Sequence, residues 1–573
     1  MNSGGIMNKS EQLDGMMYFA HRLQEATFHY TIDIYKAPIY NTNQLAYEYL
    51  LVHEKVKNKQ LNDSYLEDIK KEFLYSLEHD IVLKEYWGDD NIELAKNQIY
   101  SSNQNNIDKL MHYLYHIWNN GVYFNWCKEY IKIIISSPKE KKKIERSIKI
   151  LLPELFAYGY SNECIYKRVK YYFFEKKKSL SSINAFLDSF DVEKKEYKVY
   201  LAINKDILQF KEILNNKLRV NFDDDGNFSK LNHRADDIII SIDTIEALDE
   251  YSAVEKFKSI LNIFMLFYIA LDNKNDIDIN DVAMTFQGKE LCYVHHNNSS
   301  VKAIERFSSE EAAKYAEQTL NDLLTIFGIT PNTLFSLMQI FEKHNSAILD
   351  DNIENSFLNL WSIFEMFSNN IENGNKIEKI KKTVLIIITN NHLKRIVSDL
   401  TKNLISILGK DDFKSLLDKT DIEDKTDTYK LSCIIFLDEY SQIREEIYSK
   451  ITNPNIRSRI SQLNELGGNS KYLYKYTEQY KTRVSWHITR MYRIRNSIIH
   501  SGDSDNKIEH ICNHLHAYVD ILIDEMVNRL TCGMQLSSVD DVITFNQFRC
   551  DELQKVLNQD KRIDKEMISY ILK

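Results

Sequence analysis

Scarcity of helix-breaking residues is the feature that most limits the fold of this chain. Only 5 prolines and 15 glycines occur among its 573 residues, whereas proline alone is usually about 5% of a globular protein. Proline and glycine interrupt helices, and the many Lys, Glu, Leu and Ile residues of this chain form helices readily. The sequence therefore predicts a mainly α protein.

Length and charge set further limits. At 573 residues the chain exceeds one ordinary hydrophobic core, and about 100–200 residues per domain indicates three or four units. The formal net charge of −10 and the pI of about 5.9 exclude a globally basic nucleic-acid-binding protein. A local basic site is compatible with this balance, because net charge describes solubility and steering rather than chemistry.

The cysteines and the apolar segments bear on the compartment. The seven cysteines are scattered and contain no C-x-x-C pair, which argues for reduced thiols and against a disulfide scaffold or a zinc ribbon. Residues Met1–Asp14 are polar and carry no apolar signal core. The best candidate for a membrane span, Ile263–Leu271, has half of the ~18 residues that a span needs. We expect a cytoplasmic protein.

The pattern of residues changes along the chain. Residues 1–190 predict a helical domain of unknown role. Short β-branched runs at Tyr197–Ile203, Leu218–Phe222 and Ile238–Ile242 indicate a small α+β middle domain over residues 191–345. Helical periodicity is most regular over residues 350–530, which indicates a third domain over residues 346–535, and residues 536–573 predict a C-terminal helical appendage. The predicted helices of these last two regions are Ile353–Phe367, Ile377–Thr389, His392–Leu408, Lys481–Ile499, Ile508–Leu530 and Phe545–Leu557.

Three local features each allow two interpretations. The aromatic run from His112 to Trp126 could line an RNA groove, but a helix-packing core is favoured because no basic residues are regularly interleaved. The acidic stretch Asp223–Asn227 lacks the spacing and the terminal Glu of a calcium loop, so a hairpin turn is favoured. His295 and His296 face opposite sides of a strand, which predicts two surface histidines rather than a metal pair.

One arginine interrupts the apolar face of the predicted helix Lys481–Ile499. At 100° per residue, one face of this helix collects Val484, Ile488, Met491 and Ile498. Arg495 lies at the middle of that apolar stripe. Burying a guanidinium without a partner costs several kcal/mol. The position therefore requires an acidic partner, an anionic ligand or a cleft at an interface.

His500 and Gly502 mark the end of this helix. Glycine at such a position is a helix C-terminal signal. Five residues place His500 about 140° from Arg495, whereas Asn496 is its neighbour on the same face. Arg495 and His500 can converge if the helix ends at His500 and the imidazole swings, or if two copies of the chain face each other. A core Arg–Glu ion pair with a helix-capping histidine is the structural alternative.

The stretch Arg495–Gly502 resembles the R-x(4–6)-H motif of HEPN domains. It reads R-N-S-I-I-H-S-G, and both the asparagine after the arginine and the His-Ser-Gly ending are typical of that superfamily. Upstream, Leu360–Phe367 (L-W-S-I-F-E-M-F) is similar to the first-helix signature of the Apea-like HEPN subgroup. The two motifs occur in the expected order, and the resemblance covers residues 350–530.

The resemblance implies a helical bundle that dimerises and, in many members, cleaves RNA without a metal ion or cofactor. His500 would act as general base or acid, since histidine titrates near neutrality. Arg495 would hold the phosphate and stabilise its transition state. Asn496 would orient His500 or the ribose, and Glu365 would pair with Arg495.

Other residues near the motif have weaker signals. Arg483, Arg490 and Arg493 share the helix with Arg495 and support an anionic ligand, with Arg490 and Arg493 as RNA-binding candidates; a solvated face is the alternative. His510 and His514 have the i, i+4 spacing of a zinc pair. No carboxylate lies in the expected register beside them, so no metal site is expected.

The expected function is a metal-independent endoribonuclease that cleaves RNA such as tRNA through attack by the 2′-OH, in antiviral defence by abortive infection. The regions before residue 350 would be sensing, regulatory or substrate-positioning modules. A phage-derived or other trigger would control the enzyme, because an uncontrolled ribonuclease would poison its host. The alternatives are a non-catalytic HEPN module for RNA binding or dimerisation, and the toxin of a toxin–antitoxin pair. The expected partners are RNA and a second copy of the chain, with no membrane.

Overall fold

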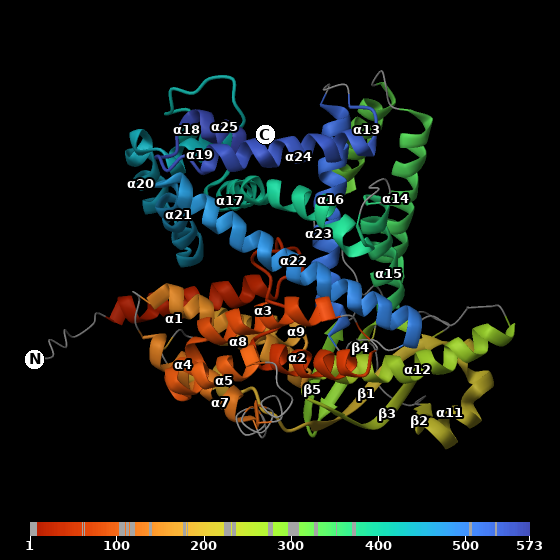
Figure 1. Cartoon of the computed structure of the whole chain (residues 1–573). Coiled ribbons are helices and arrows are strands. Elements are labelled where there is room, and N and C mark those ends of the chain that lie inside the picture. Colours follow the sequence, from red (N-terminus) through yellow and green to blue (C-terminus); the bar gives the residue numbers. More distant parts are fainter. Residues whose placement is uncertain are drawn as a thin grey trace, which may run out of the picture. The chain divides into compact units, whose positions relative to one another are not determined.

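The computed structural model describes residues 9–59, 61, 63–101, 109–110, 114, 121–136, 140–175, 179, 181–222, 231, 237–272, 279–295, 309–325, 330–350, 352–368, 374–502, 507–532 and 536–573. Helices dominate the described part of the chain (Figure 1), which confirms the mainly α fold class. The chain divides into two compact units. Unit 1 comprises residues 1–28, 40–47 and 76–298, and unit 2 comprises residues 29–39, 48–75 and 299–573.

Unit 1 opens with a group of packed helices. Helix α1 packs against α8 and α9, and α7 packs against α8. Gly15 lets α1 approach the end of α7 closely, because a Cβ at this position would lie 2.5 Å from the Ile135 carbonyl oxygen. The helices of this group are α1 (Lys9–Ala26), α4 (Ile81–Tyr86), α5 (Asp89–Ser101), α7 (Val122–Ile134), α8 (Lys141–Tyr158), α9 (Asn162–Val169), the π-helix η3 (Lys170–Glu175) and α10 (Ser181–Asp188).

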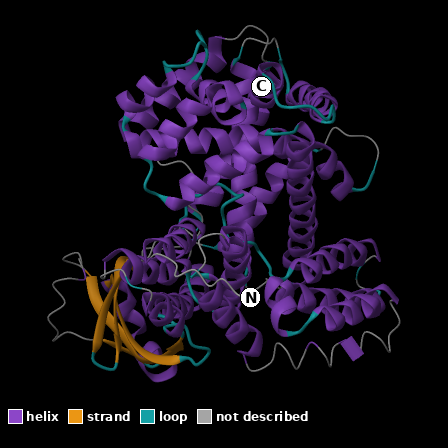
Figure 2. Ribbon diagram, turned by 90° about the vertical axis from the view of Figure 1, so that its left-hand side faces the viewer, coloured by secondary structure: helices purple, strands orange, loops and turns teal. Residues whose placement is uncertain are grey.

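The second part of unit 1 is a five-stranded antiparallel sheet with the strand order β2-β3-β1-β4-β5. Figure 2 shows this sheet in orange. Helix α12 packs against β1, β3, β4 and β5, so it covers one face of the sheet. The elements are β1 (Lys195–Asn204), the 3₁₀ helix η4 (Lys205–Phe210), α11 (Lys211–Leu218), β2 (Val220–Phe222), β3 (Asp237–Ala247), α12 (Glu250–Asp272), β4 (Ile279–Gln287) and β5 (Glu290–His295).

The predicted β runs of the middle domain fall on this sheet. Tyr197–Ile203 lies within β1, Ile238–Ile242 lies within β3, and the end of Leu218–Phe222 forms β2. His295 ends β5 with an exposed side chain. The predicted turn Asp223–Asn227 and the second histidine, His296, lie outside the described residues.

Helices are the main regular structure of unit 2 in its described residues, and residues 29–39 add an irregular segment. Helix α15 packs between α14 and α23, and α16 packs against α22, α23 and α24. The helices from residue 309 onward are α13 (Ser309–Thr325), α14 (Pro331–Leu349), α15 (Ile353–Met366), α16 (Lys376–Asn390), α17 (His392–Leu408), α18 (Lys410–Leu417), α19 (Asp427–Phe436), the 3₁₀ helix η6 (Asp438–Tyr440), α20 (Ser441–Lys450), α21 (Pro454–Gly467), α22 (Ser470–Ser501), α23 (Ile508–Thr531), α24 (Val539–Leu557) and α25 (Lys565–Leu572).

Helices α17 to α21 share one hydrophobic core with α24 and α25. The C-terminal helices are therefore part of unit 2, whereas the sequence predicts an appendage over residues 536–573. Two segments near the N-terminus also belong to this unit, residues 29–39 and 48–75. Helices α2 (Thr42–Lys57) and α3 (Asp63–His79) each contribute to both units.

The unit boundaries differ from the four predicted segments. Unit 1 joins most of the predicted helical domain to the sheet region, and unit 2 joins the predicted HEPN region to the C-terminal helices. Of the aromatic run, Tyr123 and Phe124 are buried on α7, as a packing core requires. Residues 111–113 and 115–120 of that run lie outside the described residues. Within the described chain, every helix is too short or too polar to cross a bilayer.

Candidate functional site

The candidate site lies at the C-terminal end of α22, the long blue helix of Figure 1. Its 32 residues contain no proline or glycine. The Asn469 side chain caps the first turn by accepting a hydrogen bond from the Lys471 N–H at 2.8 Å. Gly502 ends the helix at φ 68°, and its N–H donates to the Ile498 carbonyl at 3.1 Å. Helix α22 starts at Ser470, eleven residues before the predicted start at Lys481, because the predicted range leaves out this cap and the turns after it.

The buried face of α22 differs by one position from the predicted stripe. Val484, Ile488 and Met491 are buried as predicted. Ile494, rather than Arg495, continues this face and is 8% exposed. Arg495 lies beside it, with its side chain 21% exposed. The helix thus keeps Arg495 at the margin of the core rather than in its middle.

The Glu365 carboxylate gathers three donors around one oxygen atom. The Lys376 amine lies 2.8 Å from Glu365 Oε1, and the Trp361 indole N–H donates to the same oxygen at 2.8 Å. Arg495 Nε lies 3.5 Å from this oxygen. The Glu365–Arg495 pair that the sequence predicts is therefore present. Trp361 is buried on α15 and contacts the Tyr492 ring of α22, so packing fixes the position of the carboxylate.

Asn496 and His500 lie on the last two turns of α22. Arg495 Nη1 donates to Asn496 Oδ1 at 3.1 Å, which orients the amide. His500 is exposed, and no hydrogen bond or ion pair joins it to a residue that the structure describes. The helix continues through Ser501, so it does not end at His500 to let the imidazole swing toward Arg495. The structure brings Glu365, Arg495 and Asn496 together and leaves His500 outside this group.

Arg490 and Arg493 occupy a different environment from the predicted one. Arg490 is 1% exposed and binds two carboxylates. Its Nε and Nη2 donate to Glu48 at 2.9 and 2.7 Å, and its Nη2 also donates to Glu72 at 2.6 Å. Arg493 Nη2 donates to Glu48 as well. Acidic partners thus bury and neutralise both side chains, and RNA binding by Arg490 and Arg493 stays a prediction.

The pKa values of the two acids reflect this crowding. Burial raises the pKa of Glu48, but attraction from Arg490 and Arg493 outweighs burial and lowers it overall. Burial also raises the pKa of Glu72, and there the opposing attraction of Arg490 does not prevail, because the Glu48 charge adds to the effect of burial. We call these four residues, Glu48, Glu72, Arg490 and Arg493, the buried ion cluster. Sequence reasoning missed both acids, which lie more than 400 positions before Arg490.

The remaining arginine and histidine candidates also have structural partners. Arg483 Nη2 lies 3.9 Å from the buried carboxylate of Asp33, which also pairs with Arg395 at 2.6 Å. His514 is buried, and its Nε2 lies 2.9 Å from the Ala37 carbonyl oxygen, which ties this imidazole to the N-terminal segment of unit 2.

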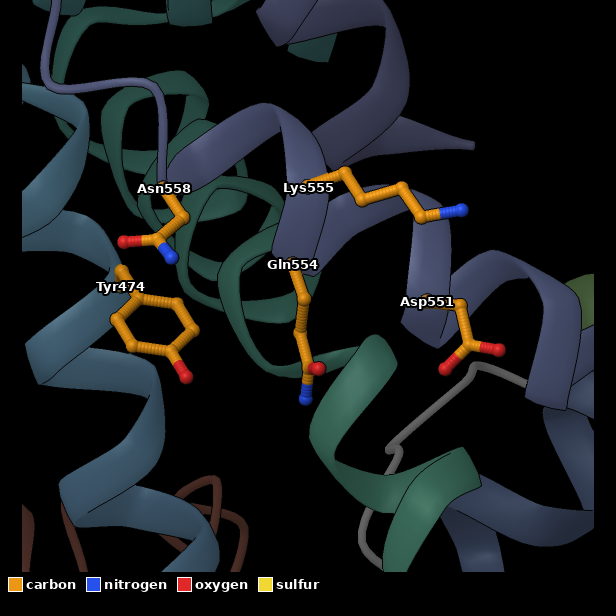
Figure 3. A pocket seen from close by; sticks show the side chains of 5 residues that line it. All are labelled: Tyr474, Asp551, Gln554, Lys555 and Asn558. Atoms are coloured by element: carbon orange, nitrogen blue, oxygen red, sulfur yellow. The ribbon is translucent and has the colours of Figure 1, made fainter.

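A shallow depression lies elsewhere on unit 2, between α22 and α24. Its lining residues are Tyr474, Asp551, Gln554, Lys555 and Asn558 (Figure 3). The Lys555 side chain extends away from the Tyr474 ring (Figure 3). Tyr474 precedes Arg495 by 21 residues, or about 30 Å along the helix axis. This depression is therefore separate from the group around Glu365.

Comparisons with known proteins add no further assignment. No family model, no curated protein and no solved structure matches this chain. The HEPN interpretation accordingly rests on the two sequence motifs and on the geometry of α15 and α22.

Proposed function

We propose that this chain is a HEPN-type endoribonuclease that cleaves RNA without a metal ion. One observation carries the proposal: α22 ends with Arg495 held by Glu365 and Asn496, while His500, in the last turn of the same helix, is exposed to solvent. An accessible imidazole can take up or give a proton, and a positioned guanidinium can neutralise charge on a phosphate, which are two of the tasks in phosphodiester cleavage by a neighbouring hydroxyl.

The chemistry follows from RNA itself. A base removes the proton from the 2′-OH, the 2′ oxygen forms a bond to phosphorus, and the bond from phosphorus to the 5′ oxygen breaks. An acid gives a proton to that leaving oxygen, which leaves a cyclic phosphate and a 5′-hydroxyl. A neutral imidazole can be the base, an imidazolium can be the acid, and Arg495 would neutralise the charge that develops on the phosphate.

The attacking 2′ oxygen and the leaving 5′ oxygen lie on opposite sides of phosphorus, so one His500 imidazole cannot contact both at the same time. On a regular helix it also lies about 140° away from Arg495. Two copies of the chain would supply two imidazoles and two guanidinium groups in one shared site, and we include such a homodimer in the proposal. A role in antiviral defence through cleavage of RNA such as tRNA, under control of a trigger, follows from the family resemblance and belongs to the same proposal.

The decisive experiment compares RNA cleavage by the wild type with cleavage by Arg495→Ala and His500→Ala, each with and without EDTA. We expect both variants to lose about 10²–10⁴-fold in rate, and we expect the wild type to cleave in EDTA. His295→Ala, another exposed histidine, serves as the matched control and should retain full activity. Identical cleavage patterns for the wild type, Arg495→Ala and His500→Ala would refute the proposal.

A non-catalytic RNA-binding or dimerisation module is the second candidate, and the position of His500 favours it. The structure holds Arg495 with Glu365 and Asn496 and leaves His500 apart from them. This candidate predicts that RNA binds without being cut. It also predicts that Arg495→Ala weakens binding and lowers its salt dependence by about one phosphate contact.

A further inference from the structure

Three metal-ligating side chains converge where α14 meets α23 in unit 2. His344 Nε2, on α14, lies 3.0 Å from His516 Nε2 and 2.9 Å from Asp520 Oδ1, both on α23. His516 Nε2 lies 3.4 Å from the same Asp520 oxygen. His516 and Asp520 are four residues apart, which places them on the same face of α23. We call these three residues the His–His–Asp group.

The separations suit a bound cation. A circle through the three atoms has a radius of about 1.8 Å. A point slightly out of their plane therefore lies about 2.0–2.1 Å from all three atoms, which is the bond length of zinc to imidazole nitrogen and carboxylate oxygen. In the described residues this is the one group of histidine, cysteine and carboxylate side chains whose ligand atoms are close enough to share an ion.

Hydrogen bonds alone do not explain all three short distances in the His–His–Asp group. The three atoms form three close pairs, and each imidazole can carry at most one hydrogen on its Nε2. If only His344 Nε2 is protonated, one hydrogen must serve both His516 and Asp520. If both Nε2 atoms are protonated, two N–H groups face each other at 3.0 Å. A cation instead accepts a lone pair from all three atoms at once.

We propose that His344, His516 and Asp520 bind a divalent transition-metal ion of the zinc class. Two imidazoles with one carboxylate suit such an ion, whereas magnesium and calcium prefer oxygen ligands alone. Three protein ligands leave a coordination position open. The side chains of His344 and Asp520 are 20% and 24% exposed, so water can reach that position. The ion would join α14 directly to α23.

One nearby charge opposes a bound cation, and the three ligands have to outweigh it. Lys36 is a buried cation whose charge acts on Asp520, and its amine donates to the His29 carbonyl at 3.1 Å. Neither Arg495 nor His500 belongs to the His–His–Asp group. The site therefore goes beyond the proposed RNA cleavage, which needs no metal.

The test uses the full chain, stripped of metal by a chelator and then titrated with Co²⁺ and with Zn²⁺. We expect one tightly bound ion per chain, visible Co²⁺ absorption bands that Zn²⁺ abolishes, and a higher Tm with either ion. His344→Gln and Asp520→Asn keep side-chain size and hydrogen-bonding capacity but remove a good ligand. Loss of a residue that only supports a ligand can weaken metal binding ~100-fold. Each of these variants removes a ligand itself and should weaken ion binding at least as much, while the helix content of the protein stays unchanged.

His510→Gln is the matched control, because it changes a histidine on the same helix outside the group and should bind the ion as the wild type does. Arg495→Ala should also keep the ion, which separates this proposal from the ribonuclease. If the wild type binds no more Co²⁺ than His344→Gln and Asp520→Asn do, the three residues form only a hydrogen-bonded group and the proposal is wrong.

Discussion

Arg490 and Arg495 lie five residues apart on α22 and occupy opposite environments. Arg490 is buried and meets the carboxylates of Glu48 and Glu72. Arg495 is partly exposed and shares the carboxylate of Glu365 with two other donors. A buried ion cluster stabilises the fold only while every member is present, because removing one leaves an uncompensated charge. A partly hydrated guanidinium can exchange its partner for another anion. One helix thus carries an arginine that fixes the fold and an arginine that is available to a ligand.

Replacing Arg490 with Met should have the largest effect on stability. The change leaves the Glu48 and Glu72 carboxylates buried without their shared partner, which costs about 3–5 kcal/mol. Arg495→Met removes one partly exposed contact and should cost about 1 kcal/mol or less. Urea unfolding followed by circular dichroism compares the two variants directly.

A double variant sharpens this test. Combining Arg490→Met with Glu72→Gln removes Arg490 and the acid that pairs with it alone, while Glu48 keeps its ion pair with Arg493, so most of the lost stability should return. Equal shifts of the urea midpoint for Arg490→Met and Arg495→Met would show that the two environments do not differ in energy, and the comparison would fail.

The histidines of unit 2 repeat the contrast between buried and exposed groups. Burial lowers the pKa of His392 to about 3 and that of His514 to about 4, and it lowers the pKa of His487 well below its ordinary value. All three side chains are buried, whereas His500 is exposed. The buried imidazoles therefore stay neutral at mildly acidic pH.

Acid should consequently destabilise unit 2. Below the ordinary histidine pKa of about 6.5, the unfolded chain takes up protons that the folded chain refuses. Stability is therefore fully present above pH ~6.5 and falls as the pH drops toward 4, by about 1.4 kcal/mol per pH unit for each buried histidine. Urea midpoints between pH 4.5 and 8 measure this slope.

Two single variants compare how a buried and an exposed histidine affect the change of stability with pH. His392 stacks on Tyr480 with ring centroids 3.7 Å apart, so His392→Phe can keep the stacking while it removes one titrating group. It should lower the slope by one histidine's share, and His500→Gln should leave it unchanged. A stability that is flat between pH 5 and 7 would contradict the assignment of neutral buried imidazoles.

Local sequence patterns predicted three helices of unit 2 to within one residue at each end. The range His392–Leu408 is the same in prediction and structure, and Ile353–Phe367 and Ile508–Leu530 differ from α15 and α23 by one residue each. These boundaries depend on caps and periodicity within a few residues, which the sequence displays directly. The Glu365–Arg495 pair was also predictable, because a guanidinium projected onto the apolar face of its helix requires an acidic partner.

Two features of α22 were not predictable in the same way: the course of its buried face and the partners of Arg490. After Val484, Ile488 and Met491, a helical stripe can continue three or four residues on, and projection alone does not choose between Ile494 and Arg495. In the structure, Ile494 continues the buried face.

Nothing local links Arg490 to acids more than 400 positions earlier, since that pairing depends on how the N-terminal segments pack.

The His–His–Asp group contains two residues that local spacing could have indicated and one that it could not. His516 and Asp520 have the i, i+4 spacing that sequence reasoning looks for, and this signal was overlooked in favour of His510 and His514. His344 lies 172 positions before His516 and carries no signal of its own. A search of predicted helices for histidine–carboxylate pairs would therefore have found two of the three residues.

Glu365→Gln should have the smallest effect on stability and still separate the two roles of arginine on α22. Glutamine can accept the Trp361 N–H bond but offers no charge to Lys376 or Arg495, and the loss of partly exposed pairs costs about 1 kcal/mol or less. If Arg495 acts on phosphate, its looser position should lower the kcat of RNA cleavage by about ten- to a hundredfold with little change in KM. Lys376→Gln keeps the Glu365–Arg495 pair and should cleave as the wild type does. If Glu365→Gln keeps the wild-type kcat, Arg495 does not need Glu365 to hold its position. Arg495 would then differ from Arg490 only in the exposure of its side chain.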